Sequence, residues 1–229
     1  MKAVTNWIKK EYGNLSSFDW SFLAAMLLLQ IFVFMLYPES PLSIVAGIAG
    51  VISVVLCAKG KFSFYFIGFV QTISYLILAW NARFYGEVIE NLWYLVTMVW
   101  GIFVWKDNLS TDKDGGQQVD SLKFTPMQWF DAVSGTVVAT LIMGFLLTKV
   151  GSAQAYTDAA TNVMAIFAQI LMVKRYREQW LWWFVIDVFC IKLWWVAGNW
   201  SMVAMYIAWT VNCIYGWVNW SKGAKKYAV

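Results

Sequence analysis

The feature that most constrains this chain is a series of apolar runs, each long enough to cross a membrane. Each run covers about 16 to 21 residues, close to the roughly 20 that a spanning helix needs. Hydrophobic residues make up 61% of the 229 residues and charged residues only 13%, whereas a soluble domain carries roughly 25% charge. The chain is therefore expected to be an all-α membrane protein with about eight transmembrane helices.

Short polar segments separate the predicted spans. A polar connection covers residues 81–90, and the long hydrophilic segment 106–125 is expected to be a mobile linker because it is rich in Asp, Gly, Gln and Ser. The polar first 19 residues are not followed by a small-residue cleavage site, so they are not expected to belong to a cleaved signal peptide. The predicted spans are approximately 20–37 (ending at Pro38), 41–58, 62–80, 91–105, 127–147, 154–173, 180–197 and 200–220.

Positive charge is distributed unevenly between the predicted loops. Fourteen of the 17 Lys and Arg residues lie on the side that holds both termini and the loops near residues 60, 115 and 175. The opposite side holds Arg83 and Lys149, and Lys192 lies within a span. By the positive-inside rule, both termini of this multi-pass protein are expected in the cytoplasm.

The chain contains an internal repeat. A shift of 115 residues aligns spans two to four with spans six to eight without a gap and gives ten identical pairs between residues 59 and 106, including Gly101 with Gly216 and Trp105 with Trp220. The two units are expected to be parallel three-helix bundles joined by a linker helix, a 3+1+3 arrangement with one accessory helix before it. The predicted divisions are 1–40 (polar segment and accessory helix), 41–106 (first bundle), 107–152 (loop and linker helix), 153–220 (second bundle) and 221–229 (basic tail).

The span from Trp180 onward is unusual because it is apolar yet carries Asp187 and Lys192. A charge near the centre of a span is costly and therefore indicates a functional site by default. Helical spacing places Trp180, Trp183 and Asp187 on one face. Lys192 follows Asp187 by five residues, which is not an intrahelical pairing distance. A buried ion pair that fixes helix packing remains the alternative to substrate contact.

Two further groups of residues are candidates for substrate binding. Trp182 and Trp183 lie deeper than the tryptophans at span ends, so they are candidates to stack on a flat ligand, although Trp is also enriched at membrane interfaces. Uncharged polar side chains at membrane depth either hydrogen-bond between helices or line a cavity. These polar candidates are Gln71, Asn91, Tyr94, Thr161, Gln169 and Asn212.

Several classes of function are disfavoured by what the sequence lacks. The chain has no histidine, its three cysteines have no CxxC spacing, and it shows no nucleophile–base pair, so neither a metal site, a cofactor nor an enzymatic activity is expected. A phosphate-cradling glycine-rich loop is also missing from the sequence. Lys192 alone would face a phosphorylated substrate, whereas indoles with one carboxylate suit a flat, neutral or cationic ring.

A set of residues spread over both halves of the chain carries a family resemblance: Asp158, Ala159, Thr161, Ala168, Gln169, Leu171, Met172, Lys174, Arg175, Glu178, Trp180, Trp183 and Asp187, with Tyr85, Gly86, Glu87, Asn91, Tyr94, Gly101 and Trp105 in the first half. In these residues the chain resembles the nicotinamide riboside transporters of the PnuC type. The resemblance covers nearly the whole chain after the first span. Such relatives often have a proline in the span after Asn91, where this chain has Val96 and Thr97.

The resemblance implies a SWEET-like fold and uptake of nicotinamide riboside by facilitated diffusion, with alternating access and trapping of the substrate by a separate cytoplasmic kinase. The expected partners are this small molecule and the lipid bilayer, with no nucleic acid, and a homo-oligomer is left open. A thiamine or riboflavin transporter, a proton-coupled symporter that uses Asp158 or Asp187, and a helical scaffold or membrane enzyme are the alternatives.

Overall fold

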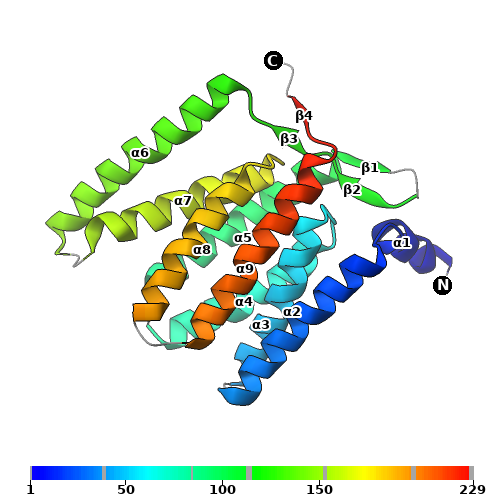
Figure 1. Ribbon diagram of the computed structural model, residues 1–229, viewed down its shortest axis with the longest axis horizontal. Coiled ribbons are helices and arrows are strands. Elements are labelled where there is room, and N and C mark those ends of the chain that lie inside the picture. Colours follow the sequence, from blue (N-terminus) through cyan, green and yellow to red (C-terminus); the bar gives the residue numbers. More distant parts are fainter. Residues whose placement is uncertain are drawn as a thin grey trace. The chain divides into compact units, whose positions relative to one another are not determined.

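The structure is a computed structural model that describes residues 2–37, 40–83, 85–111, 115–151, 154–196 and 200–226. The chain divides into two compact units, Met1–Asp120 and Ser121–Val229. Long helices dominate both units (Figure 1), so the predicted all-α class is confirmed. The boundary between the units falls inside the hydrophilic segment that precedes the predicted linker helix.

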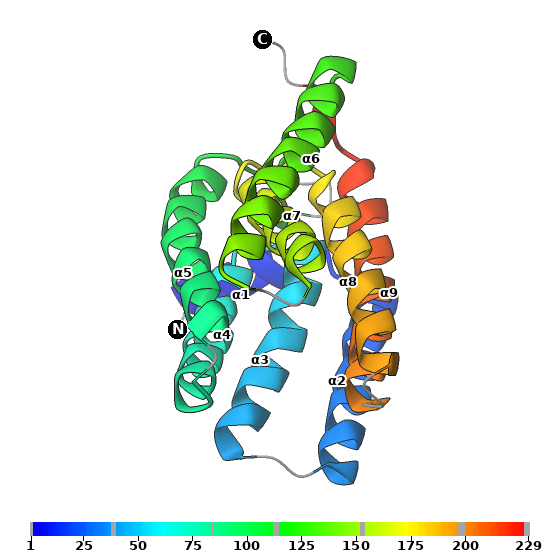
Figure 2. The same ribbon diagram turned by 90° about the vertical axis from the view of Figure 1, so that its left-hand side faces the viewer.

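In the first unit, α3 packs against both α2 and α4, and α4 packs against α5. Figure 2 shows α2 and α3 as neighbouring antiparallel helices. Gly47 and Gly50 permit a close approach of neighbouring helices: a Cβ at Gly47 would lie 2.8 Å from Phe34 of α2, and one at Gly50 would lie 3.3 Å from Gln71 of α4. The elements are α1 (Lys2–Tyr12), α2 (Ser17–Leu36), α3 (Pro41–Ala58), α4 (Phe64–Asn81), α5 (Tyr85–Lys106), β1 (Leu109–Thr111) and β2 (Gln117–Val119).

The second unit has the same succession of antiparallel neighbours. Here α6 packs on α7, α7 on α8, and α8 on α9, and Figure 1 shows α8 and α9 side by side. Its elements are β3 (Leu122–Lys123), α6 (Pro126–Lys149), α7 (Ala155–Val173), α8 (Gln179–Val196), α9 (Trp200–Ser221) and β4 (Lys225–Lys226).

The predicted spans correspond to α2–α9, with small differences at their ends. Helix α5 begins at Tyr85, inside the predicted polar connection, where Glu87 in its first turn favours a helix N-terminus. Six helices, α2 to α7, have a described stretch that is long and apolar enough to cross a membrane. The lengths of α8 and α9 are 18 and 22 residues. Pro38 and Ala197, at which two spans were predicted to end, lie outside the described residues.

The prediction of a mobile linker at residues 106–125 is wrong for the part of this segment that the structure describes. Strand β1 pairs with β2 in an antiparallel hairpin, and β3 pairs with β4 in parallel. Buried apolar side chains anchor the segment within its units: Val119 in the first, Leu122 and Phe124 in the second. The polar composition misled the prediction because a few well-spaced apolar residues suffice to hold such a segment in place.

The polar N-terminal segment also proves to be ordered, since residues 2–12 form α1. Glu11 of this helix is buried and accepts a hydrogen bond from the backbone N–H of Ser63 at 2.6 Å, at the N-terminus of α4. A carboxylate is favourable there because unsatisfied N–H groups give a helix N-terminus partial positive charge. Lys61, two residues before Ser63, is fully buried. Its ammonium group donates to the Asn14 side chain and, at 2.7 Å, to the backbone carbonyl of Gln117.

The turn after the first helix of the repeat has the same conformation in both units. Gly60 and Arg175, which the shift of 115 residues aligns, have φ angles of +64° and +66°. The residue after each donates its N–H to the carbonyl of a leucine in the preceding helix, Leu56 or Leu171, at 2.9 and 2.8 Å. Because a non-glycine residue rarely adopts this left-handed conformation, its recurrence at Arg175 supports the predicted internal repeat.

A large aromatic ring lies against a glycine at a second pair of aligned positions. Tyr65 of α4 covers Gly101 of α5, and Trp180 of α8 covers Gly216 of α9, so that a Cβ on either glycine would overlap the ring. The identical glycines found by the alignment therefore have the same role in both units: each lets one aromatic residue bring its two helices together.

Helices α2 and α6 also begin alike. Each starts with a capping box. The third residue of each helix, which completes its capping box, also contacts the turn around Gly60 or Arg175. Asp19 of α2 pairs with Lys59 at 3.0 Å, and Gln128 of α6 donates to the Tyr176 hydroxyl at 3.0 Å. The predicted 3+1+3 grouping treated α2 as an accessory outside the repeat, whereas α2 packs on α3 as α6 packs on α7.

Candidate functional site

Asp187 lies near the middle of α8 and is only 4% exposed. Its Oδ2 accepts a hydrogen bond from the Cys213 thiol of α9 at 3.4 Å. Trp180, predicted to share a helix face with Asp187, also contacts α9, through Gly216. Burial of a carboxylate is costly unless it is paired or strongly hydrogen-bonded, and a thiol is a weak donor. A stronger donor or a cation beside Asp187 would therefore be favourable.

The first unit carries a neutral pair at the aligned positions. The hydroxyl oxygen of Thr72 in α4, which the repeat aligns with Asp187, lies 3.8 Å from the Met98 sulfur of α5. Met98 is in turn the counterpart of Cys213. Neither Thr72 nor Cys213 was among the sequence candidates, although the shift of 115 residues that defined the repeat would have identified both. Within each unit, the two matching helices thus contact each other at the aligned positions. Of these aligned residues, only Asp187 of the second unit carries an ionisable carboxylate.

Trp182 and Trp183 occupy different surroundings, although they are adjacent. Trp182 is buried against the Trp129 indole, with ring centroids 6.0 Å apart and planes 28° apart. Its Nε1–H donates to the hydroxyl of Thr136 at 3.2 Å. Trp183 is partly buried and packs against the hydrophobic cluster that contains Trp182, Phe124 and Tyr176. The Trp182 indole is therefore engaged with α6, and Trp183 remains the more accessible of the two predicted stacking residues.

Lys192 is exposed on α8 and forms no ion pair with Asp187 in the part of the chain that the structure describes. It also lies about one turn from the end of the helix rather than at its middle. The alternative that these two residues form a buried structural ion pair is therefore wrong. Long basic side chains near the end of a span extend to the interface, which suits an exposed position.

The polar candidates of the first unit form local hydrogen bonds. The buried Asn91 donates its side-chain N–H to the Glu87 carbonyl at 2.7 Å. Tyr94 donates its hydroxyl hydrogen to the Glu90 carboxylate. Gln71 accepts a hydrogen bond from the Thr72 hydroxyl at 3.2 Å. Glu90 was missed by sequence reasoning because it was assigned to a polar loop rather than to α5.

The polar candidates of the second unit lie on two helices. Thr161 of α7 donates to main-chain carbonyls of its own helix, those of Thr157 and Asp158, at 3.2 and 3.1 Å. Gln169 of α7 and Asn212 of α9 are both buried. Asn212 directly precedes Cys213 in α9, and adjacent side chains on a helix do not share a face. Among the described residues, no three Asp, Glu, Cys or His side chains converge as metal ligands would.

Residues 40–222 match the family model described as nicotinamide mononucleotide transporter. A nicotinamide riboside transporter PnuC of Haemophilus influenzae is 35% identical over 96% of both chains. One of Neisseria mucosa is 33% identical over 97% of this chain and 88% of the relative.

The fold agrees with this similarity in sequence. A solved structure described as the crystal structure of the vitamin B3 transporter PnuC matches with a TM-score of 0.82 and 32% identity, over 95% of this chain and 96% of that one. Since these relatives are transporters, the prediction that the chain is not an enzyme is confirmed. The chain belongs to the PnuC family of membrane transporters.

Proposed function

We propose that this protein carries nicotinamide riboside across the inner membrane. The observation that carries the proposal is the 35% identity over 96% of both chains to a nicotinamide riboside transporter. The proposed mode is facilitated diffusion with alternating access, and a separate cytoplasmic kinase then traps the substrate. Both termini are proposed to lie in the cytoplasm, because fourteen of the 17 basic residues fall on that side in the predicted topology.

Asp187 is the proposed recognition group for the substrate. Nicotinamide riboside has a cationic pyridinium ring and ribose hydroxyls, and each is a stronger partner for a buried carboxylate than the thiol of Cys213 that now faces it. Trp183 is the proposed stacking residue, since an indole face attracts a flat cation. Trp182 and Lys192, also predicted to bind substrate, are given lower weight because one is packed against α6 and the other is exposed.

The polar side chains of both units are proposed to bind the amide and ribose of the substrate. The hydrogen bonds that Gln71, Asn91, Tyr94 and Thr161 form within single helices are compatible with this role, because a hydroxyl or amide can exchange such a bond for one to a ligand. The proposed side chains are Gln71, Asn91, Tyr94, Thr161, Gln169 and Asn212.

The riboside is favoured over the mononucleotide that gives the matching family model its description. A phosphate group brings additional negative charge and needs cations, typically Arg or Lys, to bind it. In the described parts of α2 to α9, Lys192 is the only basic residue that does not end its helix, and it is exposed. The mononucleotide would therefore lack a counter-charge at membrane depth.

Flux into liposomes that contain the purified protein tests the proposal. Labelled nicotinamide riboside is expected to equilibrate across the membrane without ATP or an ion gradient, and an excess of the mononucleotide is not expected to compete with it. Asp187→Asn should slow this flux at least tenfold, while Asp131→Asn, at an exposed position on α6, should leave it unchanged. Absence of riboside flux through the wild-type protein would refute the proposal.

A proton-coupled symporter is the second candidate, because a buried carboxylate such as Asp187 is a typical proton carrier in transporters. The same liposomes distinguish the two modes. In facilitated diffusion, an imposed pH gradient does not drive accumulation of the riboside above its external concentration. Accumulation that follows the gradient and is lost in Asp187→Asn would replace facilitated diffusion with symport.

A further inference from the structure

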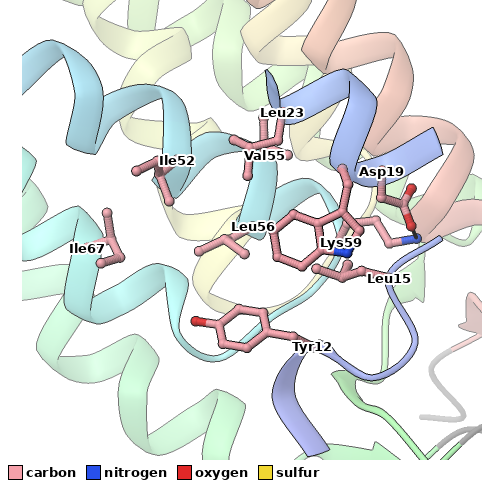
Figure 3. A pocket seen from close by; sticks show the side chains of 10 residues that line it. Tyr12, Leu15, Asp19, Leu23, Ile52, Val55, Leu56, Lys59 and Ile67 are labelled. Carbon is pink, nitrogen blue, oxygen red and sulfur yellow. Dashed lines mark ion pairs between the residues drawn. The ribbon is translucent and has the colours of Figure 1, made fainter. Parts of the chain in front are cut away.

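The first unit contains an apolar pocket beside the N-terminal end of α2 (Figure 3). Its volume is about 190 Å³, below the roughly 300–1,000 Å³ of sites for drug-sized ligands. Aliphatic side chains form most of its wall: Leu23 of α2, Ile52, Val55 and Leu56 of α3, and Ile67 of α4. A pocket of this size and lining suits a single hydrocarbon chain better than a ring system with polar groups.

The two ends of this pocket differ in charge. Figure 3 shows the Asp19–Lys59 ion pair at one end and the side chains of Ile52 and Ile67 at the other. The Nζ of Lys59 lies 3.0 Å from the Asp19 carboxylate. An occupant of this pocket therefore needs an apolar tail and a polar head.

The pocket exists because the first unit lacks an indole that the second unit has. The repeat aligns Ile67 with Trp182, which fills the corresponding place on α8 and stacks on Trp129 of α6. Trp20 stands in α2 where Trp129 stands in α6, directly after the last residue of the capping box. Trp20 remains 50% exposed. Because the first unit has the smaller Ile67 where the second unit has Trp182, a pocket remains in the first unit at the place that the indole fills in the second.

The surroundings of the pocket are those of a membrane interface with excess positive charge. Helices α2 and α4 begin at this level and α3 ends there, on the side where the predicted topology gathers fourteen of the 17 basic residues. The exposed Lys9 and Lys10 lie in the last turn of α1, whose Tyr12 lines the pocket. A half-exposed tryptophan is typical of this depth, and basic clusters there attract anionic lipid headgroups.

We propose that this pocket binds one acyl chain of an anionic phospholipid, with the headgroup beside Lys59 and the basic end of α1. The aliphatic wall accounts for the chain. The lysines account for the preference for a negative headgroup, which would compete with Asp19 for the Lys59 ammonium. The inference does not depend on which solute the protein carries.

Native mass spectrometry of the full-length protein in detergent, titrated with phosphatidylglycerol or with phosphatidylcholine of the same chains, tests this site. The wild type is expected to bind one phosphatidylglycerol at least tenfold more tightly than phosphatidylcholine. Ile67→Trp, which supplies the indole of the second unit, should abolish this first binding event. Val70→Trp is the matched control, because Val70 is 46% exposed on the same helix, and it should bind as the wild type does.

Lys59→Gln tests the contribution of the headgroup separately from that of the acyl chain. It should lower the affinity for phosphatidylglycerol to that for phosphatidylcholine. If Ile67→Trp does not fold, Ile67→Phe is titrated in its place with the same expected loss. The proposal is overturned if the Ile67 variant with the larger side chain binds phosphatidylglycerol like the wild type, or if the wild type shows no preference between the two lipids. Equal binding of free oleate would also overturn it, because the occupant would then not be a phospholipid.

Discussion

The two units use the same backbone features but fill them with different side chains. Both have a left-handed residue after their first aligned helix, and both have an aromatic ring packed on a glycine. At the position where the second unit has the charged Asp187, the first has Thr72, and Trp182 is replaced by Ile67. Turns and close helix contacts tolerate little change, since a shift there moves whole helices. Interior side chains can diverge, and that is where the two units acquire distinct sites.

The difference between Trp182 and Ile67 gives the largest predicted effect on stability. Trp182→Ala removes a stacked indole and its bond to Thr136, so it should lower the unfolding free energy by about 3–5 kcal/mol. Ile67→Ala removes a side chain that already borders a pocket and has fewer contacts to lose, so a loss of about 2 kcal/mol or less is expected. SDS titration followed by circular dichroism measures both values. Equal losses would mean that the two positions are packed alike.

Substitution of the aligned glycines tests whether the shared contact is equally tight. Gly216→Ala forces a methyl group into the rigid indole of Trp180, and a loss of about 1–3 kcal/mol is expected. Gly101→Ala meets the outer end of the Tyr65 ring, which can shift more easily, so the loss should be smaller. Gly223→Ala, with no heavy atom within 4 Å of the added carbon, is the control in the same SDS titration. A greater loss for Gly101 would reverse this account.

The helix caps should give the smallest and most similar effects. Ser16→Ala and Thr125→Ala each remove the side-chain acceptor of a capping box, which typically costs about 1 kcal/mol. If α2 starts the first unit as α6 starts the second, the two losses should agree within about 0.5 kcal/mol, the usual size of context effects at independent sites. If only Thr125→Ala lowered the unfolding free energy, α2 would be an accessory helix and not the counterpart of α6.

The long helices could be predicted from the sequence because a bilayer demands about 20 apolar residues per span, and α3 has the predicted bounds at both ends. Helix α1 was missed because an amphipathic helix of 11 residues resembles a polar segment in composition. The short strands, of two or three residues each, carry no periodic signal. Their positions depend on partners distant in sequence, such as Arg175 for Leu122.

The candidate site was only partly predictable for a related reason. Rarity within an apolar span identified Asp187, and the same criterion also selected Lys192, which proved to be exposed. Adjacent tryptophans could not be distinguished, because whether an indole meets α6 or remains accessible depends on tertiary packing. Cys213 and Thr72 were overlooked since each is unremarkable alone and gains meaning only from its place in the repeat.

Calorimetric titration of the purified protein with nicotinamide riboside, thiamine and riboflavin tests the central claim, that the charge confined to the second unit supports recognition of the riboside. We expect the riboside to bind and the other two not to bind. Asp187→Thr, which gives the second unit the residue of the first, should weaken riboside binding roughly 10- to 100-fold, as expected for loss of one hydrogen bond to a charged group. Unchanged affinity in Asp187→Thr, or binding of thiamine or riboflavin in place of the riboside, would contradict the account.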